Sequence, residues 1–130
     1  MPTTFDGDVE RLRAALQGNA DFLDRVAPEL ERIAASVLIV NHGSRYVMLN
    51  DKACALTGYS RAELLRKTII DLTPPDAVEV YERLWDSFVR GMKQYGFYTI
   101  RRKDGSTLSV KYCAYMDVLP SIHVSFITAV

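Results

Sequence analysis

The chain has 130 residues, in which 16 Lys and Arg residues balance 16 Asp and Glu residues, and it contains two cysteines. A net charge of zero excludes a general electrostatic attraction to nucleic acid or to an anionic membrane, and two cysteines are too few for a disulfide scaffold. No apolar run reaches the roughly 18 residues of a membrane span, and the first residues lack the basic and then apolar pattern of a signal peptide. We therefore expect one cytoplasmic protein with reduced thiols and with neither nucleic acid nor membrane as a partner.

The first 35 residues carry an apolar stripe with alternating gaps of three and four, which is typical of a packed helix. Its members are Val9, Leu12, Leu16, Leu23, Val26 and Leu30, with Asn19 completing the spacing. Two interpretations of residues 1–35 stay open. The first is a dimerisation segment, in which the six apolar residues form the interface of a homodimer. The second is a cap that covers the chain's own sheet, and both hold if the helices also contact a partner.

Residues 36–50 are predicted to form two antiparallel strands. Residues 36–40 are a short apolar run, and residues 46–50 form the returning strand. Residues 41–43 supply the turn between them, in which we expect His42 to be solvated.

The stretch from Asn50 to Leu65 combines several local signals for helix boundaries. Asn50 is followed by a small-residue helical turn, and Gly58 provides the positive φ that ends such a turn at low cost. Ser60 and Glu63 have the spacing of a capping box, in which a hydroxyl group and a carboxylate bind backbone N–H groups at the start of a helix. The stretch therefore predicts one short helix, a stop at Gly58 and a second helix from Ser60.

This order of an Asn, a small-residue helix, Leu-Thr-Gly-Tyr-Ser and Glu-Leu resembles the signature of PAS sensory domains. A later Lys-Asp-Gly-Ser hairpin at residues 103–106 extends the resemblance over residues 36–130. The resemblance implies an α+β fold, a PAS-like five-stranded antiparallel sheet with helices on one face, preceded by the helical segment of residues 1–35. It also implies a sensor for signal transduction that is not an enzyme. Histidine kinases and transcription regulators contain such domains, so we expect an output domain or partner protein that is not in this chain.

A helix and three strands are predicted to complete the domain. The helix carries an aromatic stripe that is expected to pack on the sheet, namely Val78, Tyr81, Leu84, Trp85 and Phe88. A two-residue turn at Asp104-Gly105 is predicted to join strands 97–102 and 107–118. In the last strand, residues 122–130, we place Phe126 on the face covered by this helix and His123 on the opposite face.

The residues give little support for cofactor chemistry or catalysis. The candidate metal ligands lie on four predicted elements, namely His42, Cys54, Cys113 and His123, so no metal site is expected. Flavin-binding relatives have a reactive cysteine in the segment that corresponds to residues 65–72, and haem-binding relatives place a histidine near residues 76–92. Both segments lack the required residue, so we expect neither flavin nor haem. A small α+β-cone enzyme that uses Asp71 or His123 is kept as an alternative.

An apolar pocket between the sheet and the helices is the remaining candidate site. The residues predicted to line it are Tyr46, Met48, Asn50, Trp85, Tyr98, Tyr112 and Phe126. Such a pocket suits a small apolar or amphipathic ligand, for instance a fatty acid. The alternative is a core that is filled by side chains, which would make the domain a ligand-free dimerisation or protein-interaction module.

Overall fold

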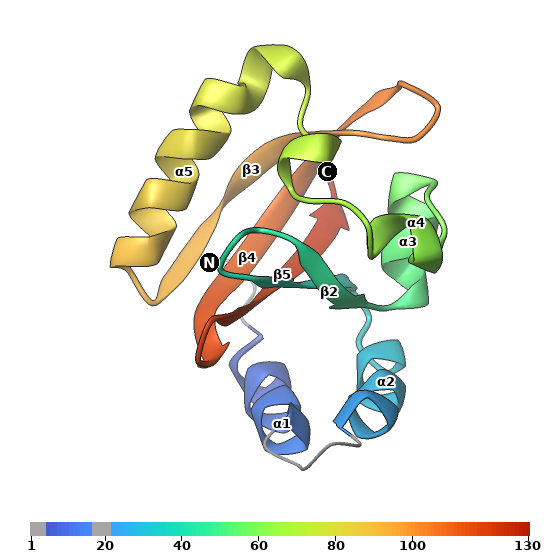
Figure 1. Cartoon of the computed structure of the whole chain (residues 1–130), viewed down its shortest axis with the longest axis vertical. Helices are drawn as coiled ribbons and strands as arrows, with labels where there is room; N and C mark the ends of the chain where they lie inside the picture. Colours follow the sequence, from blue (N-terminus) through green and yellow to red (C-terminus); the bar gives the residue numbers. More distant parts are fainter. Residues whose placement is uncertain (1–4, 17–21) are drawn as a thin grey trace.

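The structure is a computed structural model that describes residues 5–16 and 22–130 (Figure 1). In this part of the chain, five strands form one antiparallel sheet: β1 (Ser36–Asn41), β2 (Tyr46–Leu49), β3 (Lys93–Arg101), β4 (Thr107–Leu119) and β5 (Ile122–Ala129). The α-helices are α1 (Asp6–Leu16), α2 (Phe22–Glu31), α3 (Asp51–Thr57), α4 (Arg61–Leu64) and α5 (Val78–Arg90), and the 3-10 helices are η1 (Ile70–Leu72) and η2 (Pro75–Ala77). Within the described residues, no helix is long and apolar enough to cross a membrane.

The sheet lies between two layers of helices, and its strand order is β2-β1-β5-β4-β3. The segment between β2 and β3, which contains α3, α4 and α5, covers one face, and α1 and α2 pack on the other (Figure 1). This arrangement confirms the predicted α+β fold, in which a five-stranded antiparallel sheet with helices on one face follows an N-terminal helical segment.

Helices α1 and α2 contribute directly to the core of the domain. The side chains of the predicted stripe that lie there are Val9, Leu12, Val26 and Leu30, each at most 3% exposed and in one cluster with residues of the sheet. The side chains of Leu16 and Leu23 are not among those that the structure describes. The four described members of the predicted interface are therefore core residues of their own chain, as the cap interpretation expects. A homodimer stays a prediction.

Asn50 connects three elements through a side chain that is completely buried. Its Oδ1 accepts hydrogen bonds from the N–H groups of Val37 and Ala53, at 3.0 and 3.1 Å, and thereby caps α3. Its Nδ2 donates to the carbonyl oxygens of Leu30 and Ala35, at 3.0 Å each. A buried amide needs partners for both of its polar atoms, and here both have them. Asn50 therefore joins the end of α2 and the start of β1 to α3.

The helix boundaries that follow Asn50 confirm the predicted local signals. Gly58 ends α3 with φ 80°, a left-handed conformation that costs glycine little. Ser60 Oγ accepts a hydrogen bond from the N–H of Glu63, and the Glu63 carboxylate accepts one from the N–H of Ser60, which completes the capping box of α4. The Lys103 ammonium group, 2.8 Å from Glu63 Oε2, and the Ser60 N–H lower the pKa of Glu63 to about 2.

Strand pairing decides which side chains of β5 face α5. Phe126 pairs with Cys113 and stacks on Phe5, with 4.3 Å between the ring centroids, so that it faces α1 and α2. His123 is three residues away and faces the opposite side, toward α5. Our prediction for these two residues was wrong because the alternation of a strand defines two faces but does not say which helices cover each of them.

A β-bulge in β2 separates the directions of Tyr46 and Met48. Tyr46 pairs with Val40 and Met48 pairs with Ile39, so that Val47 is an extra residue on its strand. Strict alternation would put Tyr46 and Met48 on one face. Because of the bulge, Tyr46 faces the layer that contains α5, whereas Met48 packs with α1 and α2.

A candidate ligand cavity between the sheet and helix α5

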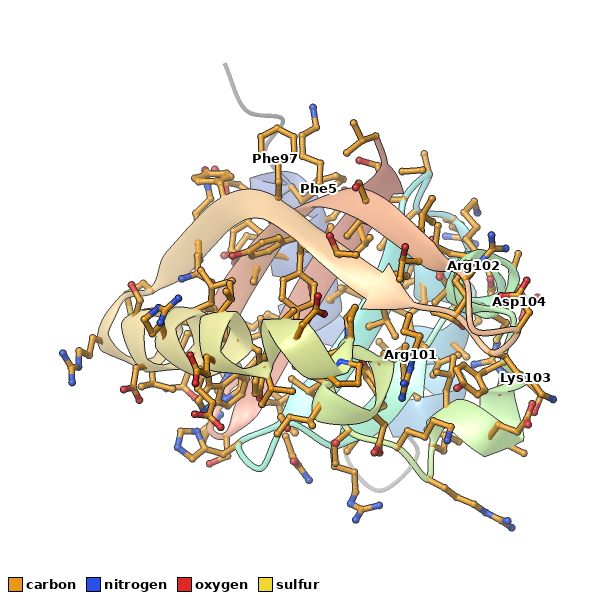
Figure 2. All side chains as sticks on the ribbon, turned by 90° about the horizontal axis from the view of Figure 1, so that it is seen from above. Phe5, Phe97, Arg101, Arg102, Lys103 and Asp104 are labelled. Atoms are coloured by element: carbon orange, nitrogen blue, oxygen red, sulfur yellow. The ribbon has the colours of Figure 1, made fainter. Side chains whose placement is uncertain are left out.

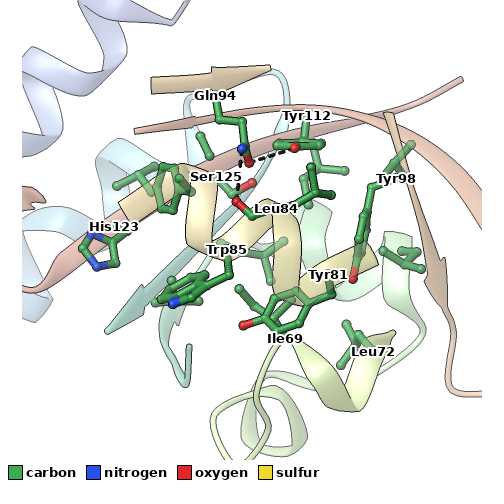
Figure 3. Close-up of a pocket in the computed structure, with 18 of the residues that line it drawn as sticks. Ile69, Leu72, Tyr81, Leu84, Trp85, Gln94, Tyr98, Tyr112, His123 and Ser125 are labelled. Atoms are coloured by element: carbon green, nitrogen blue, oxygen red, sulfur yellow. Dashed lines mark hydrogen bonds between the residues drawn. The ribbon is translucent and has the colours of Figure 1, made fainter. Parts of the chain in front are cut away.

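A cavity of about 110 Å³ lies between the sheet and α5 (Figure 3). Side chains from all five strands, from α5 and from the segment around η1 line it. The aromatic and polar lining residues are Tyr46, Tyr81, Trp85, Phe88, Gln94, Tyr98, Tyr112, His123 and Ser125, and the aliphatic ones are Leu38, Val40, Ile69, Leu72, Leu84, Ile100, Val110, Ala114, Val124 and Ile127. The wall is mostly apolar with a few polar atoms, as in typical sites for small molecules.

The structure brings together part of the predicted pocket. Of the residues predicted to line the pocket, those that the structure places at the cavity are Tyr46, Trp85, Tyr98 and Tyr112. Met48 and Phe126 do not line it, because the bulge in β2 and the register of β5 turn them toward α1 and α2. Asn50 does not either, because its side chain is bonded to the backbone around α3.

The lining residues that were absent from the prediction include Tyr81, Gln94 and His123. Tyr81 lies one helical turn before Trp85 on α5, so the spacing of the aromatic stripe was a signal that could have included it. Gln94 lies in the part of β3 that precedes the predicted start of the strand at residue 97. His123 was assigned to the wrong face of β5.

Most polar atoms on the wall of the cavity form hydrogen bonds within the protein. The Tyr98 hydroxyl oxygen lies 2.6 Å from Thr73 Oγ1. The Tyr112 hydroxyl group donates to Gln94 Oε1 at 2.9 Å, and Gln94 Nε2 donates to the carbonyl oxygen of Leu84 at 3.1 Å (Figure 3). The side chain of Gln94 therefore connects β3 and β4 to α5.

Tyr46 differs from Tyr98 and Tyr112 in its hydrogen bonding. It is 6% exposed, and none of the hydrogen bonds among the described residues involves its hydroxyl group. Burial raises the pKa of Tyr46, and the neighbouring Tyr98 and Tyr81 raise it further, so the group stays protonated and able to donate. An oxygen atom of a ligand in the cavity would accept a hydrogen bond from this group.

Comparison with known proteins decides the family. The family model of the PAS fold matches residues 25–117, which is more than half of the chain. The chain belongs to the PAS family. PAS domains are in general sensory and signalling modules without enzymatic activity. The match begins within α2, so the division into residues 1–35 and 36–130 stays a prediction.

Solved structures of PAS domains share the fold of this one. A PAS domain from Colwellia psychrerythraea is 16% identical with a TM-score of 0.72, covering 85% of this chain and 98% of that chain. One from a two-component sensor histidine kinase is 15% identical with a TM-score of 0.71, covering 83% and 96%. One from a LuxR-family transcriptional regulator of Burkholderia thailandensis, in complex with ethanol, is 13% identical with a TM-score of 0.68, covering 79% and 95%. A search of curated proteins found no match.

Two histidines of this PAS domain meet at the cavity. His123, which is 1% exposed, accepts a hydrogen bond at Nδ1 from the backbone N–H of Asp117, at 2.9 Å. Its Nε2 therefore carries the hydrogen and donates toward Nδ1 of His42, at 3.3 Å. His42 is exposed as expected, but it is also the partner of a buried residue from a distant strand. Among the described residues, no group of three His, Cys, Asp or Glu is placed to hold a metal ion.

The surroundings of His123 favour its neutral form. Burial lowers the pKa of His123 and the nearby His42 lowers it further, while the Asp117 carboxylate, 3.8 Å away, acts in the opposite direction. The imidazole ring packs edge-to-face against Trp85 and Phe88, with centroids 5.9 and 5.7 Å apart. A neutral His123 thus connects the turn after β1 to helix α5 at the wall of the cavity.

Proposed function

We propose that this PAS domain is a sensor that binds a compact, mainly apolar molecule in the cavity between the sheet and α5. The observation that carries the proposal is the cavity itself, with its volume of about 110 Å³, its mostly apolar wall and the unbonded hydroxyl group of Tyr46. An apolar cavity of roughly 150 Å³ in another protein holds benzene. We therefore infer a ligand of about that size, with one oxygen atom placed near Tyr46.

The sequence analysis expected a ligand such as a fatty acid. The small volume of the cavity fits a short or cyclic alcohol better, and we propose this class of ligand instead. Pockets for larger ligands measure roughly 300–1,000 Å³, so a long acyl chain would need the walls to move apart. The LuxR-family domain whose structure contains ethanol has the same fold, which supports a compact ligand with a hydroxyl group. Haem and flavin are also too large for this volume, and we propose neither as a cofactor.

The bound molecule would act by shifting the packing of both helical layers. One wall of the cavity is α5, which the side chain of Gln94 ties to β3 through the carbonyl group of Leu84. Val124 of β5 lines the cavity and also belongs to the cluster that holds α1 and α2. A ligand therefore contacts α5 directly and reaches α1 and α2 through the sheet. We propose that an output domain or a partner protein, not in this chain, reads this change.

Trp85 provides the test, because it lines the cavity and is the only tryptophan of the chain. We expect cyclohexanol to change the fluorescence of Trp85 saturably and hexadecanoate to leave it unchanged. Ala114→Leu fills the cavity and should abolish the response, at a cost of about 1–3 kcal/mol in stability. Ala129→Leu, at an exposed position of β5, is the matched control and should respond like the unmodified protein.

Tyr46→Phe tests the role of the unbonded hydroxyl group. It should weaken the binding of cyclohexanol by about tenfold, the effect of one hydrogen bond of roughly 1.4 kcal/mol, and leave the binding of cyclohexane unchanged. A folded Ala114→Leu protein that still responds to cyclohexanol would place the ligand outside the cavity. If neither cyclohexanol nor cyclohexane binds to the unmodified protein, the domain is a ligand-free interaction module, which is the alternative function.

A further inference from the structure

Strand β3 forms a long, unprotected edge of the sheet. It has nine residues, pairs with β4 alone among the described elements, and has a ladder without a bulge. The opposite edge strand, β2, has four residues and contains a bulge. Proteins commonly protect the edges of their sheets by short strands, bulges or prolines, because a free edge pairs with other extended chains. In β3 none of these three devices occurs.

The backbone of β3 offers a regular series of free hydrogen-bonding groups. Met116 N–H donates to the carbonyl oxygen of Met92, and Arg102 N–H donates to that of Ser106, so the even-numbered residues of β3 form the ladder with β4. The N–H and C=O groups that point away from the sheet belong to Lys93, Tyr95, Phe97, Thr99 and Arg101. A further strand could therefore pair along the whole of β3.

Large apolar side chains accompany this free edge. Phe97 is 71% exposed and Tyr95 is 40% exposed. Tyr98 and Ile100 line the cavity, so the odd-numbered side chains belong to the other face of the sheet. Figure 2 shows Phe97 projecting outward from the strand. Exposed aromatic side chains beside a free edge mark a surface for association.

The charges around Phe97 select the kind of partner. Lys93 and Arg101 stand at the two ends of β3, and Lys111 lies opposite Phe97 on β4. A second copy that paired symmetrically with all nine residues would be centred on Phe97 and would place Lys93 opposite Arg101 twice. Like charges that face each other destabilise a sheet. Lys93 has Asp6 as a partner at 2.9 Å, whereas Arg101 and Lys111 form no ion pair with any described residue.

We propose that the edge of β3 binds an extended, acidic segment of a partner protein, which adds to the sheet as a sixth strand. The backbone of the segment would bond to the free groups of β3, and such bonds supply affinity with little dependence on sequence. Selectivity would come from an apolar residue that packs on Phe97 and from acidic residues near Arg101 and Lys111. This site lies outside the cavity and does not depend on the proposed ligand.

Two peptides matched to the nine residues of β3 test the proposal. One alternates Thr and Val between terminal Glu residues, and the other has Lys in place of both Glu residues. We expect the Glu peptide to shift the amide resonances of Tyr95, Phe97 and Thr99 in the full chain and to slow their hydrogen exchange. The amides of Tyr98 and Ile100 already bond to β4 and should change less. The Lys peptide should bind at least about tenfold more weakly.

Variants of β3 separate pairing from charge recognition. Thr99→Pro removes an N–H group that points away from the sheet, but it removes no hydrogen bond between β3 and β4. The protein should therefore stay folded but no longer bind the Glu peptide. Arg101→Glu should reverse the preference for the two peptides. Phe97→Ser should weaken binding by about tenfold. Ile70→Ser, at a 44% exposed position of η1, is its matched control and should leave binding unchanged.

Four results would overturn the proposal. The first is equal affinity for the Glu and Lys peptides, and the second is a Thr99→Pro protein that binds the Glu peptide as well as the unmodified protein does. The third is the absence of amide resonance shifts with either peptide up to about 1 mM, and the fourth is self-association of the chain through the edge of β3. Sedimentation of the chain without peptide tests the last of these. A dimer that Thr99→Pro abolishes would assign the edge of β3 to a second copy.

Discussion

The side-chain nitrogen of Asn50 lies 3.0 Å from the carbonyl oxygen of Leu30, so one buried amide holds the end of α2 against the start of α3. Asn50→Ala would leave the carbonyl group of Ala35 and the N–H of Val37 without a partner. Each such buried group costs about 1–3 kcal/mol, so we expect a loss of roughly 3 kcal/mol or more in the free energy of unfolding. Urea denaturation measures this loss.

Asn41→Ala is the matched control for Asn50→Ala. Asn41 accepts hydrogen bonds from the N–H groups of Gly43 and Arg45 in an exposed turn, where water replaces the lost acceptor. Its substitution should cost only about 1 kcal/mol. Equal losses for the two variants would contradict the assignment of Asn50 as the joint between α2, β1 and α3.

The N-terminal helices should stabilise the monomer through the apolar core. Leu12 is completely buried, so Leu12→Ala should lower the free energy of unfolding by about 2–5 kcal/mol. Leu65→Ala, at a 39% exposed position, should change it by less than about 0.5 kcal/mol. Deletion of residues 1–35 would uncover the apolar face of the sheet, so we expect the truncated protein to aggregate.

The predicted homodimer can be tested against this packing. A dimer that uses Leu12 and Leu30 requires these side chains to leave their own sheet, for instance by an exchange of helices between two copies. Exchange of this kind is slow because it breaks the core. Sedimentation velocity before and after long incubation at high concentration would therefore reveal a slowly formed dimer, and a rapid equilibrium would require another surface.

Stability should fall in mildly acidic solution because of His123. The pKa of His123 is lowered in the folded protein, so below its ordinary pKa of about 6.5 the unfolded chain binds the proton more readily. The contribution of neutral His123 to the free energy of unfolding is therefore present above about pH 6.5. It is lost as the pH falls through the pKa that His123 has in the folded protein. His123→Gln should show a smaller change in the urea midpoint between about pH 8 and pH 5.

His42→Gln is the control for this pH dependence. His42 is exposed, so its substitution should leave most of the pH dependence in place. Trp85 packs edge-to-face on His123, and its fluorescence gives a second readout of the protonation of the folded state. A His123→Gln protein with the same pH dependence as the unmodified protein would contradict the role of His123.

The capping box of α4 should make a measurable local contribution. Ser60 Oγ accepts the N–H of Glu63, and Ser60→Ala should cost about 1 kcal/mol. Ser87→Ala, at an exposed position inside α5, should leave stability unchanged or raise it slightly, because Ala is the better helix former. Thermal unfolding of the two variants compares them, and a stable Ser60→Ala protein would show that tertiary contacts alone hold α4.

The sequence alone determined the features that depend on neighbours a few residues apart. The stop at Gly58 and the capping box of Ser60 and Glu63 depend on local backbone geometry and hydrogen bonds, so their spacing predicted them correctly. The hairpin between β3 and β4 also follows from local turn chemistry, but the N–H of Arg102 bonds to Ser106, so the connection is residues 103–105 and not the predicted two residues 104–105.

Only the tertiary structure decided what each face contacts. The bulge in β2 turned Met48 away from the cavity, and the pairing of β5 with β4 put Phe126 against α1 and His123 against α5. The contact between His42 and His123 joins residues that are 81 positions apart. Periodicity tells which residues share a face, but the register between distant strands decides which layer covers that face, and this register depends on the packing of the whole core.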